Sequence, residues 1–355
     1  MAARSIGPDG NEPALSVRRV VLLIWATILV LTPYERLAAL PPLTFDDVGI
    51  VAVFVGRPRA PSALVQYDVL LFLRVSGLLA LGISAFAQVP RLRCLSHCFA
   101  FASVLVLDSV AKSVGGYVNH AQAVPLIVLG IVTAGQVFEE VDSYWRSRGM
   151  SRRDADRRGW SADEGVVWAS GVTIVIAYTF TGANRIVYGG GSVVGGDAIL
   201  PQMVLASYQY SAFGFQVAPD IIETAWGRGL LRTGFAAVTC LEVLAAGVFC
   251  RDWFRRVWLL SMSAFHIAAL VLMNILFWEN ILLIWAVFGR SELDAAARMI
   301  GRVCPSVHEG ARHGHDSGGL QLVVAAEGAS IVQGEEGMAS YWAVVRTRTW
   351  HKLAP

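Results

Sequence analysis

The chain has 355 residues, of which 55% are hydrophobic and only 16% are charged. Soluble domains carry about 25% charged residues, so this composition argues against a water-soluble enzyme and favours a polytopic membrane protein. The 29 Lys and Arg residues nearly balance the 27 Asp and Glu residues. Without a basic excess, no nucleic-acid partner is expected. The five cysteines are scattered and do not suggest a disulfide framework.

Apolar runs set the predicted organisation. The first 17 residues are polar and predict a disordered lead. The apolar runs that follow are 20–31, 63–87, 94–107, 121–138, 165–186, 230–250 and 256–288, and the last is long enough for two helices that break near Trp278. Since about 20 residues cross a bilayer, residues 18–290 predict an all-α transmembrane bundle of about eight helices, with seven as the alternative. Residues 291–355 predict a polar, mostly disordered cytoplasmic tail.

The positions of the arginines predict the orientation of the chain. They gather beside every second loop, at positions 18–19, 91–93, 146–158 and 251–256. Cytoplasmic loops carry such an excess, so both termini are expected in the cytoplasm. No cleavable leader is evident, and a multi-pass protein of the plasma membrane is predicted. The glycine-rich stretch 187–228 is then an outside loop, which we expect to cap a cavity in the membrane.

Ionisable residues within apolar runs need a structural or chemical reason. Each costs roughly 2.5–3.5 kcal/mol at the membrane centre and therefore usually faces the bundle interior. Glu242 and His266 lie in the middle of their runs, and a functional or pairing role is expected for both. Asp68 and Arg74 share one run at a spacing that does not pair them, so each is expected to bond a neighbouring helix. Glu279 lies near an outer turn.

Other polar residues lie at the outer ends of the predicted helices. Lys112 and Arg185 could line a cavity open to the outside or simply extend to the membrane interface. Asn119 and His120 could take part in chemistry, or Asn119 could cap the helix that follows.

No metal site is predicted. The cluster Cys94, His97 and Cys98 has ligand-like residues but no second ligand pair nearby. The histidines at 308, 313 and 315 belong to the polar tail, where a solvated segment is expected.

Several short segments, taken in order, resemble one known family. They are Leu70–Gly82 followed by Arg91, Leu107-Asp108 leading through Lys112 to Asn119-His120, Tyr178-Thr-Phe-Thr-Gly-Ala-Asn-Arg-Ile186, and Phe265-His266, with an acidic residue at Glu242. Over residues 18–290 the chain resembles the HTTM family, the membrane domain shared with vitamin K-dependent γ-carboxylase.

The resemblance implies chemistry on a quinone. In the carboxylase, the membrane domain oxygenates reduced vitamin K to the epoxide, which generates a base that removes a γ-proton from glutamate before CO2 adds. A lysine initiates this by deprotonating the quinol. Arg185 stands at the matching position, and an arginine does not give up its proton at usable pH, so it cannot act as that base. Asn119 and His120 match the family's Asn-His pair.

Two classes of function follow. The first is a carboxylase-like or epoxidase-like enzyme that acts on a quinone or another lipid-soluble substrate. Its expected catalytic residues are Asn119, His120, Arg185 and His266, and its expected substrate-binding residues are Lys112, Tyr178, Glu242 and Glu279. His120 or His266 would accept a proton, and Arg185 would stabilise an oxyanion. The second is a non-catalytic membrane partner for peptide maturation, export or immunity, with the stretch 139–158 as a docking segment. Membrane lipids and a peptide substrate or partner protein are the expected partners.

Overall fold

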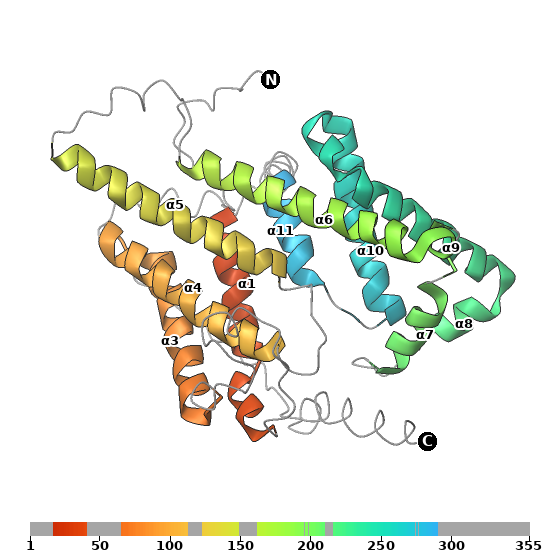
Figure 1. Cartoon of the computed structure of the whole chain (residues 1–355), viewed down its shortest axis with the longest axis horizontal. Helices are drawn as coiled ribbons and strands as arrows, with labels where there is room; N and C mark the ends of the chain where they lie inside the picture. Colours follow the sequence, from red (N-terminus) through yellow and green to blue (C-terminus); the bar gives the residue numbers. More distant parts are fainter. Residues whose placement is uncertain are drawn as a thin grey trace, which may run out of the picture. The chain divides into compact units, whose positions relative to one another are not determined.

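The computed structural model describes residues 17–40, 65–112, 123–148, 162–194, 196–197, 199–209, 216–273, 275 and 277–289. Every regular element in these residues is helical, which confirms the all-α prediction for this part of the chain (Figure 1). The elements are α1 (Val17–Leu31), η1 (Tyr34–Ala39), α3 (Tyr67–Phe86), α4 (Pro90–Lys112), α5 (Ala123–Ser147), α6 (Ala162–Val194), α7 (Ile199–Gln209), α8 (Val217–Glu223), α9 (Ala225–Val243), η4 (Ala245–Phe249), α10 (Asp252–Met273) and α11 (Trp278–Phe288). The predicted disordered tail, residues 291–355, and residues 1–16 of the predicted lead lie outside the described residues.

Five of these helices are long and apolar enough to cross a membrane. They are α3, α4, α5, α6 and α10. Of the other predicted spans, α1 has 15 residues and α11 has 11, whereas α9 is interrupted by arginines at positions 228 and 232. These apolar helices are compatible with an integral membrane protein, but the predicted count of about eight spans is not confirmed.

The chain folds into two compact units. Of the described residues, those within 17–183, 241–262 and 277–289 belong to the first unit, and those within 184–240 and 263–275 belong to the second. Three long helices, α6, α9 and α10, each contribute one end to each unit.

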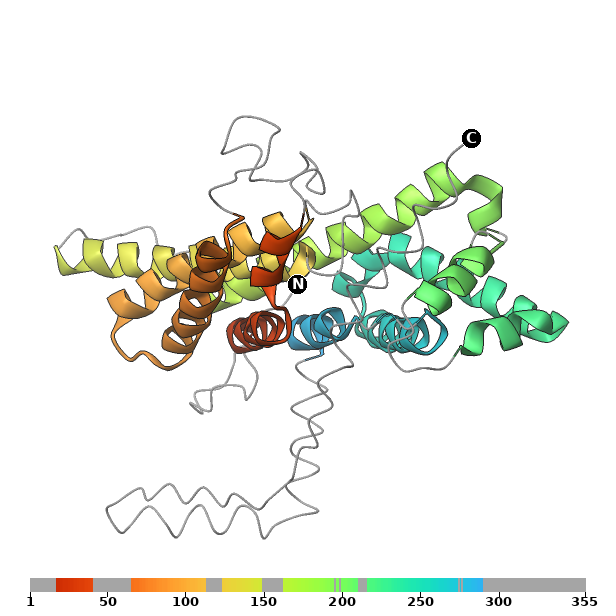
Figure 2. The same cartoon turned by 90° about the horizontal axis from the view of Figure 1, so that it is seen from below.

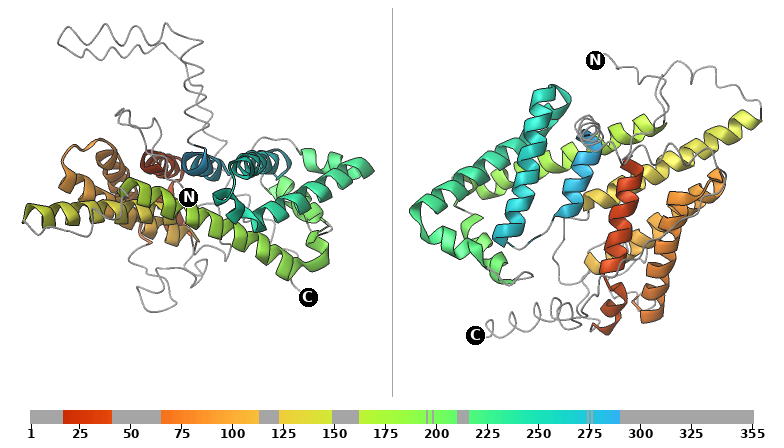
Figure 3. Two further views of the ribbon diagram at one scale, coloured as in Figure 1. Left: turned by 90° about the horizontal axis from the view of Figure 1, so that it is seen from above. Right: turned by 180° about the vertical axis from the view of Figure 1, so that it is seen from behind.

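The first unit is built around α1. This helix lies between α3 and α11 (Figures 1 and 3), and α1 and α11 are seen side by side and nearly end-on in Figure 2. Its buried residues are Val17, Val20, Val21, Leu22, Ile24, Trp25, Ile28 and Leu29. Most of them recur at intervals of three and four, so one broad face of α1 forms the core. The indole of Trp25 also donates a hydrogen bond to the carbonyl of Pro125 at 3.2 Å, which ties α1 to the start of α5.

Small residues set the close approaches in this unit. A Cβ added to Gly77 of α3 would lie 3.2 Å from the Cβ of Ser103 in α4. On α6, a Cβ added to Gly182 would lie 2.8 Å from the Cβ of Glu242 and 2.9 Å from the backbone nitrogen of Val243. Glycine lets these backbones come together, as small residues commonly do between membrane helices.

The second unit has a separate apolar core. Its buried residues are Val193, Ile199, Leu200, Met203, Ala218, Phe235 and Leu272. The short helices α7 and α8 contact each other and supply several of them. The turn before α7 requires Gly196, which has φ of 73° and packs against the backbone of Arg232. The side chain of Arg232 also reaches Asp197 at 2.6 Å.

The glycine-rich stretch 187–228, which we predicted as a re-entrant or capping loop outside the membrane, contains helical segments. Helix α6 is kinked at Gly190 and ends at Val194, and α7 and α8 follow. The sequence of α7 explains its helix, because Ile199, Met203 and Ala206 are buried and recur at intervals of three and four. The capping role over a membrane cavity stays a prediction.

Two further boundaries differ from the prediction. The predicted run 230–250 is two elements, because α9 ends at Val243 and η4 follows. Gly247 marks this change, since a Cβ there would lie 2.8 Å from the ring of Phe254. The predicted break in run 256–288 is confirmed, but it falls between Met273 and Trp278 rather than at Trp278 to Asn280.

Candidate functional site

Two residues predicted to be catalytic lie close together in the second unit. The guanidinium carbon of Arg185 in α6 lies 5.3 Å from the ring centre of Phe235 and 5.8 Å from that of Phe265. His266, next to Phe265 on α10, is buried and feels the positive charge of Arg185. The rings of Phe265 and His266 are 5.4 Å apart. From the sequence we expected Arg185 and His266 in one site, but we did not identify Phe235 as a neighbour.

This arrangement combines a fixed cation with a titratable ring. A guanidinium over aromatic faces keeps its charge and is held in place by cation–π attraction. A neutral imidazole can accept a proton near neutral pH. Together they can bind a hydroxyl that is losing its proton, because the imidazole can receive the proton while the guanidinium stabilises the oxyanion that forms. Arginine cannot supply the base, so any proton acceptor in this cluster is His266.

Glu242 and Tyr178 lie in the first unit. Glu242 is almost completely buried, one residue before the end of α9, where its Cβ faces Gly182. The ring of Tyr178 packs edge-on against Trp258 at 5.2 Å and 85°. Trp258 is fully buried and donates its indole N–H to the carbonyl of Leu241 at 3.2 Å. The ring of Tyr178 is partly buried and packs against the core of this unit.

Lys112 is paired within its own helix. Its Nζ lies 2.5 Å from Oδ2 of Asp108, one turn earlier, and the Asp108 side chain is only 2% exposed. The other carboxylate oxygen, Oδ1, is buried without a hydrogen-bond partner among the described residues. The prediction that Lys112 binds substrate stays open, but its ammonium is already committed to a buried carboxylate. Asn119 and His120, which follow in the sequence, lie outside the described residues.

Glu279 lies in the first turn of α11 and is buried. A carboxylate is stabilised at the positive end of a helix, and no side chain caps this N-terminus. Its Oε2 has no partner among the described residues. Glu279 is thus a second carboxylate with a buried, unpaired oxygen in the first unit.

Arg74 belongs to a polar cluster whose acidic member, Glu35, we did not predict. The Nε of Arg74 donates to the carbonyl of Leu29 at 2.6 Å, and the Nη2 of Arg74 donates to the carbonyl of Val30 at 2.8 Å. Its Nη1 lies 2.7 and 2.9 Å from the two carboxylate oxygens of Glu35. The prediction that Arg74 bonds a neighbouring helix is confirmed, whereas Asp68 is exposed in the first turn of α3.

The Arg74 cluster provides hydrogen-bond donors for the C-terminal end of α1, which is a short helix. A helix of 15 residues is about 22 Å long, shorter than the roughly 30 Å core of a bilayer. Its last carbonyls have no partner within the helix and would find no water in hydrocarbon. Arg74, seven residues into α3, lies about 10 Å along that helix and satisfies two of those carbonyls. Glu35 then neutralises the arginine.

The structure does not test the prediction that the chain has no metal site, because part of the chain lies outside the described residues. Among the described residues, no group of three or more His, Cys, Asp or Glu side chains is arranged to hold a metal ion. His97 is buried, and its Nδ1 lies 2.9 Å from the carbonyl of Arg93 in the same helix, so its role there is local.

The predicted site residues therefore do not form one constellation in the described residues. Arg185 and His266 come together in the second unit, whereas Lys112, Tyr178, Glu242 and Glu279 belong to the first. The hollow between α4 and α5 contains none of them. No family model, curated protein or solved structure matches this chain.

Proposed function

We propose that the protein is an integral membrane protein of the HTTM type that binds a quinone or a similar lipid-soluble, oxygen-bearing substrate. The cluster of Arg185 and His266 is the proposed binding site. Arg185 holds a developing oxyanion on the substrate, and His266 accepts its proton. Asn119 and His120 are proposed to act in the same reaction, as the resemblance implies. The plasma membrane and a cytoplasmic position of both termini belong to this proposal.

One observation carries the proposal. A permanently charged guanidinium from α6 lies against two aromatic rings, one on α9 and one on α10, beside a buried histidine. Such ionisable groups at membrane depth are costly and usually serve a function. Flat aromatic surfaces next to a cation also suit a planar ring that carries an oxygen.

A specific feature favours a second candidate, a non-catalytic membrane partner in peptide maturation, export or immunity. Arg185 stands where the family has its base, and its guanidinium is packed on Phe235 and Phe265. This packing stabilises the unit whether or not a substrate binds. The ion pairs in the stretch proposed for docking count against this candidate. Glu139 and Glu140 pair with Arg18 and Arg91, each at 3.3 Å, which leaves fewer free charges for a partner.

The first test is to identify what the purified protein carries. The full chain is purified in mild detergent, its small molecules are extracted, and native mass spectrometry follows binding of an added short-chain naphthoquinone. Arg185→Ala and His266→Gln are expected to lose most of the bound quinone. Arg251→Ala, at an exposed position on the chain, is the control for the arginine and should retain it. His120→Ala tests the part of the proposal that rests on the resemblance.

The outcomes separate the two candidates. Monodisperse variants that lose quinone while Arg251→Ala keeps it support the binding site. A protein that carries only phospholipids, and whose variants take up naphthoquinone as the parent does, refutes the site and favours the partner candidate. Arg185→Lys provides a further test, because the resemblance implies a lysine base at this position and the variant restores that residue type. Oxygen consumption with a reduced naphthoquinone should then rise above that of the parent.

A further inference from the structure

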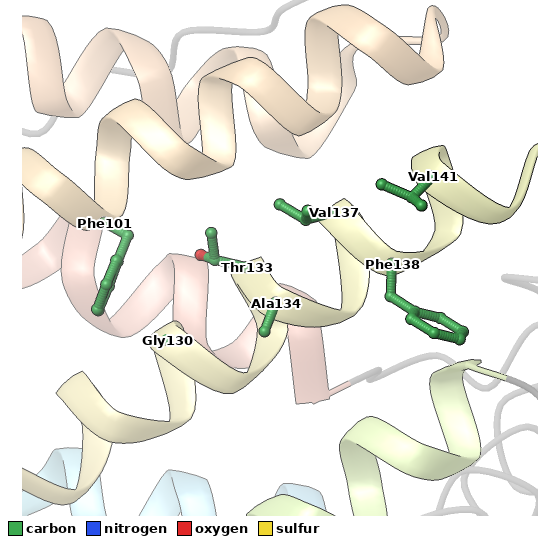
Figure 4. A pocket seen from close by; sticks show the side chains of 7 residues that line it. All are labelled: Phe101, Gly130, Thr133, Ala134, Val137, Phe138 and Val141. Atoms are coloured by element: carbon green, nitrogen blue, oxygen red, sulfur yellow. The ribbon is translucent and has the colours of Figure 1, made fainter. Parts of the chain in front are cut away.

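The hollow between α4 and α5 has a volume of about 450 Å³ and an almost wholly apolar lining. Phe101 of α4 lies opposite Gly130 of α5, and Thr133, Val137 and Val141 project from one side of α5 (Figure 4). Gly130 lets the Phe101 ring pack closely against α5 at this end of the hollow, because a Cβ on Gly130 would lie 3.2 Å from the ring. Val137 and Val141 remain 38% and 46% exposed. The hollow is thus open along the outer surface of this helix pair.

Two contacts fix the direction of the hollow. Phe101 meets Gly130 at one end, and Nε of Arg91 lies 3.3 Å from Oε1 of Glu140 at the other. Both helices advance ten residues between these contacts, in opposite directions. The helices are therefore antiparallel, and the hollow leads from the middle of the pair toward Arg91.

The length of the hollow matches one leaflet of a bilayer. From Gly130 to Val141, α5 advances about 16 Å at 1.5 Å per residue. Half of a hydrocarbon core of roughly 30 Å is about 15 Å. The hollow therefore has the depth that one acyl chain occupies.

Beyond the hollow, the same side of α5 becomes aromatic and then basic. Val137, Val141, Tyr144 and Arg148 follow one another at intervals of three and four residues, so they lie on one face. The guanidinium carbon of Arg148 lies 4.7 Å from the ring centre of Tyr144. Tyr144 and its neighbour Trp145 are half exposed, as aromatic residues at the membrane interface usually are. Arg148 then lies at headgroup level.

Arg91 supplies a second cation at this end of the hollow. Its side chain is 79% exposed despite the contact with Glu140, so its other guanidinium N–H groups face outward. The arginine pattern predicts that this end is cytoplasmic, where the leaflet is rich in anionic lipids. Arg91 lies level with Glu140, one turn before Tyr144, and Arg148 lies over the Tyr144 ring, so two cations flank the aromatic residues at the end of the hollow, where the phosphate of a lipid would lie.

We propose that this hollow holds one acyl chain of an anionic phospholipid of the cytoplasmic leaflet, with the lipid phosphate beside Arg91 and Arg148. This site is separate from the cluster of Arg185 and His266, and the proposal does not depend on the function proposed above. The lipid fills a surface that the helices leave unpacked and holds α4 against α5.

The test titrates delipidated full-length protein in detergent with phosphatidylglycerol or with phosphatidylcholine of the same acyl chains. Native mass spectrometry measures the apparent Kd of the first lipid bound. Arg91→Ala and Arg148→Ala should each weaken phosphatidylglycerol binding about five-fold, which corresponds to about 1 kcal/mol per basic residue at a membrane surface. Phosphatidylcholine binding should change little. Arg251→Ala is the matched control and should leave both affinities unchanged.

Two further variants separate the headgroup from the acyl chain. Glu140→Gln removes the competing carboxylate beside Arg91 and should tighten phosphatidylglycerol binding, opposite in sign to Arg91→Ala. Ala134→Trp fills the hollow and should weaken both lipids, whereas Leu79→Trp, on the exposed face of α3, should weaken neither. Glycerol 3-phosphate alone, which has no acyl chain, should not displace the bound lipid.

Several results would overturn the proposal. Equal affinity for the two lipids in the parent protein would remove the role of the arginines. Unchanged binding in Ala134→Trp would place the lipid elsewhere. A dimer that forms without lipid and dissociates in Ala134→Trp would show that a second copy of the chain covers this surface instead.

Discussion

Replacing Arg74 with alanine tests how the first unit is held together. The change removes every hydrogen bond that this side chain makes to the carbonyls of Leu29 and Val30 and to the carboxylate of Glu35. The side chains of Arg74 and Glu35 are only 19% and 13% exposed. The variant therefore leaves a largely buried carboxylate without its partner and the end of α1 without its cap.

The expected cost is about 3 kcal/mol in the free energy of unfolding. Removing one member of a buried ion pair costs about 3–5 kcal/mol, and the residual exposure of both side chains lowers this figure. The two carbonyls add to it, since an unpaired buried acceptor costs about 1–3 kcal/mol, but detergent headgroups and water offset part of that cost. Arg74→Lys should fall between the parent and Arg74→Ala, because it keeps the charge but loses the forked geometry.

The assay is equilibrium unfolding in mixed micelles of a mild detergent and sodium dodecyl sulfate, followed by helical circular dichroism. Arg251→Ala serves as the control, since its side chain is exposed and such changes usually stay within about 0.5 kcal/mol. The double variant Arg74→Met, Glu35→Gln completes a thermodynamic cycle. It should cost less than the sum of the two single variants, because each single variant leaves the other residue of the pair buried without its partner.

The reasoning is refuted if Arg74→Ala costs no more than Arg251→Ala. It is also refuted if the single and double variants are additive, because the pair would then contribute nothing as a pair.

Three smaller predictions use the same unfolding assay. Gly182→Ala should cost about 1–3 kcal/mol by overpacking the crossing with α9, whereas Gly82→Ala, which has open space around its Cα in α3, should be neutral or slightly stabilising. Gly196→Ala should cost more than Gly190→Ala, because both have positive φ but only the former would also collide with neighbouring backbone. Trp258→Phe should cost about 1 kcal/mol for its lost hydrogen bond, besides any loss of packing.

Each of these predictions has a clear contrary result. Equal stabilities of the two alanine variants in α3 and α6 would mean that the helix crossing adapts without strain. Equal costs at the two glycines of positive φ would mean that backbone conformation alone matters there. A neutral Trp258→Phe would show that its indole N–H is not needed in the core.

Much of the helical architecture followed from hydropathy alone. Apolar runs predicted the helices that became α3, α4, α5, α6 and α10, because a membrane or a core selects for the same long apolar segments. Their ends were less predictable. Glycines at positions 189–191 predicted a break in the helix, and α6 is kinked at Gly190, where φ is 51°. The helical turn that follows to Val194 was not predicted, because glycine allows either conformation.

The contacts within the candidate sites were harder to predict than the residues. Arg74 stood out in its run, but its partner Glu35 is 39 positions away, and no spacing rule connects them. Arg185 and His266 were each singled out, while their proximity depends on how α6 and α10 pack. The Asp108–Lys112 pair is different, because a one-turn spacing on a helix can be read from the sequence.

The bond between Arg74 and the end of α1 has a consequence for how the protein is made. As each helix leaves the translocon, α1 is short and ends in uncapped carbonyls, and α3 carries an arginine whose transfer to lipid costs about 2.5–3.5 kcal/mol. The arginine of α3 donates hydrogen bonds to the uncapped carbonyls of α1, so the contact lowers both costs. We therefore expect α1 to stay beside the translocon until α3 emerges, so that the two helices partition into the bilayer as a pair.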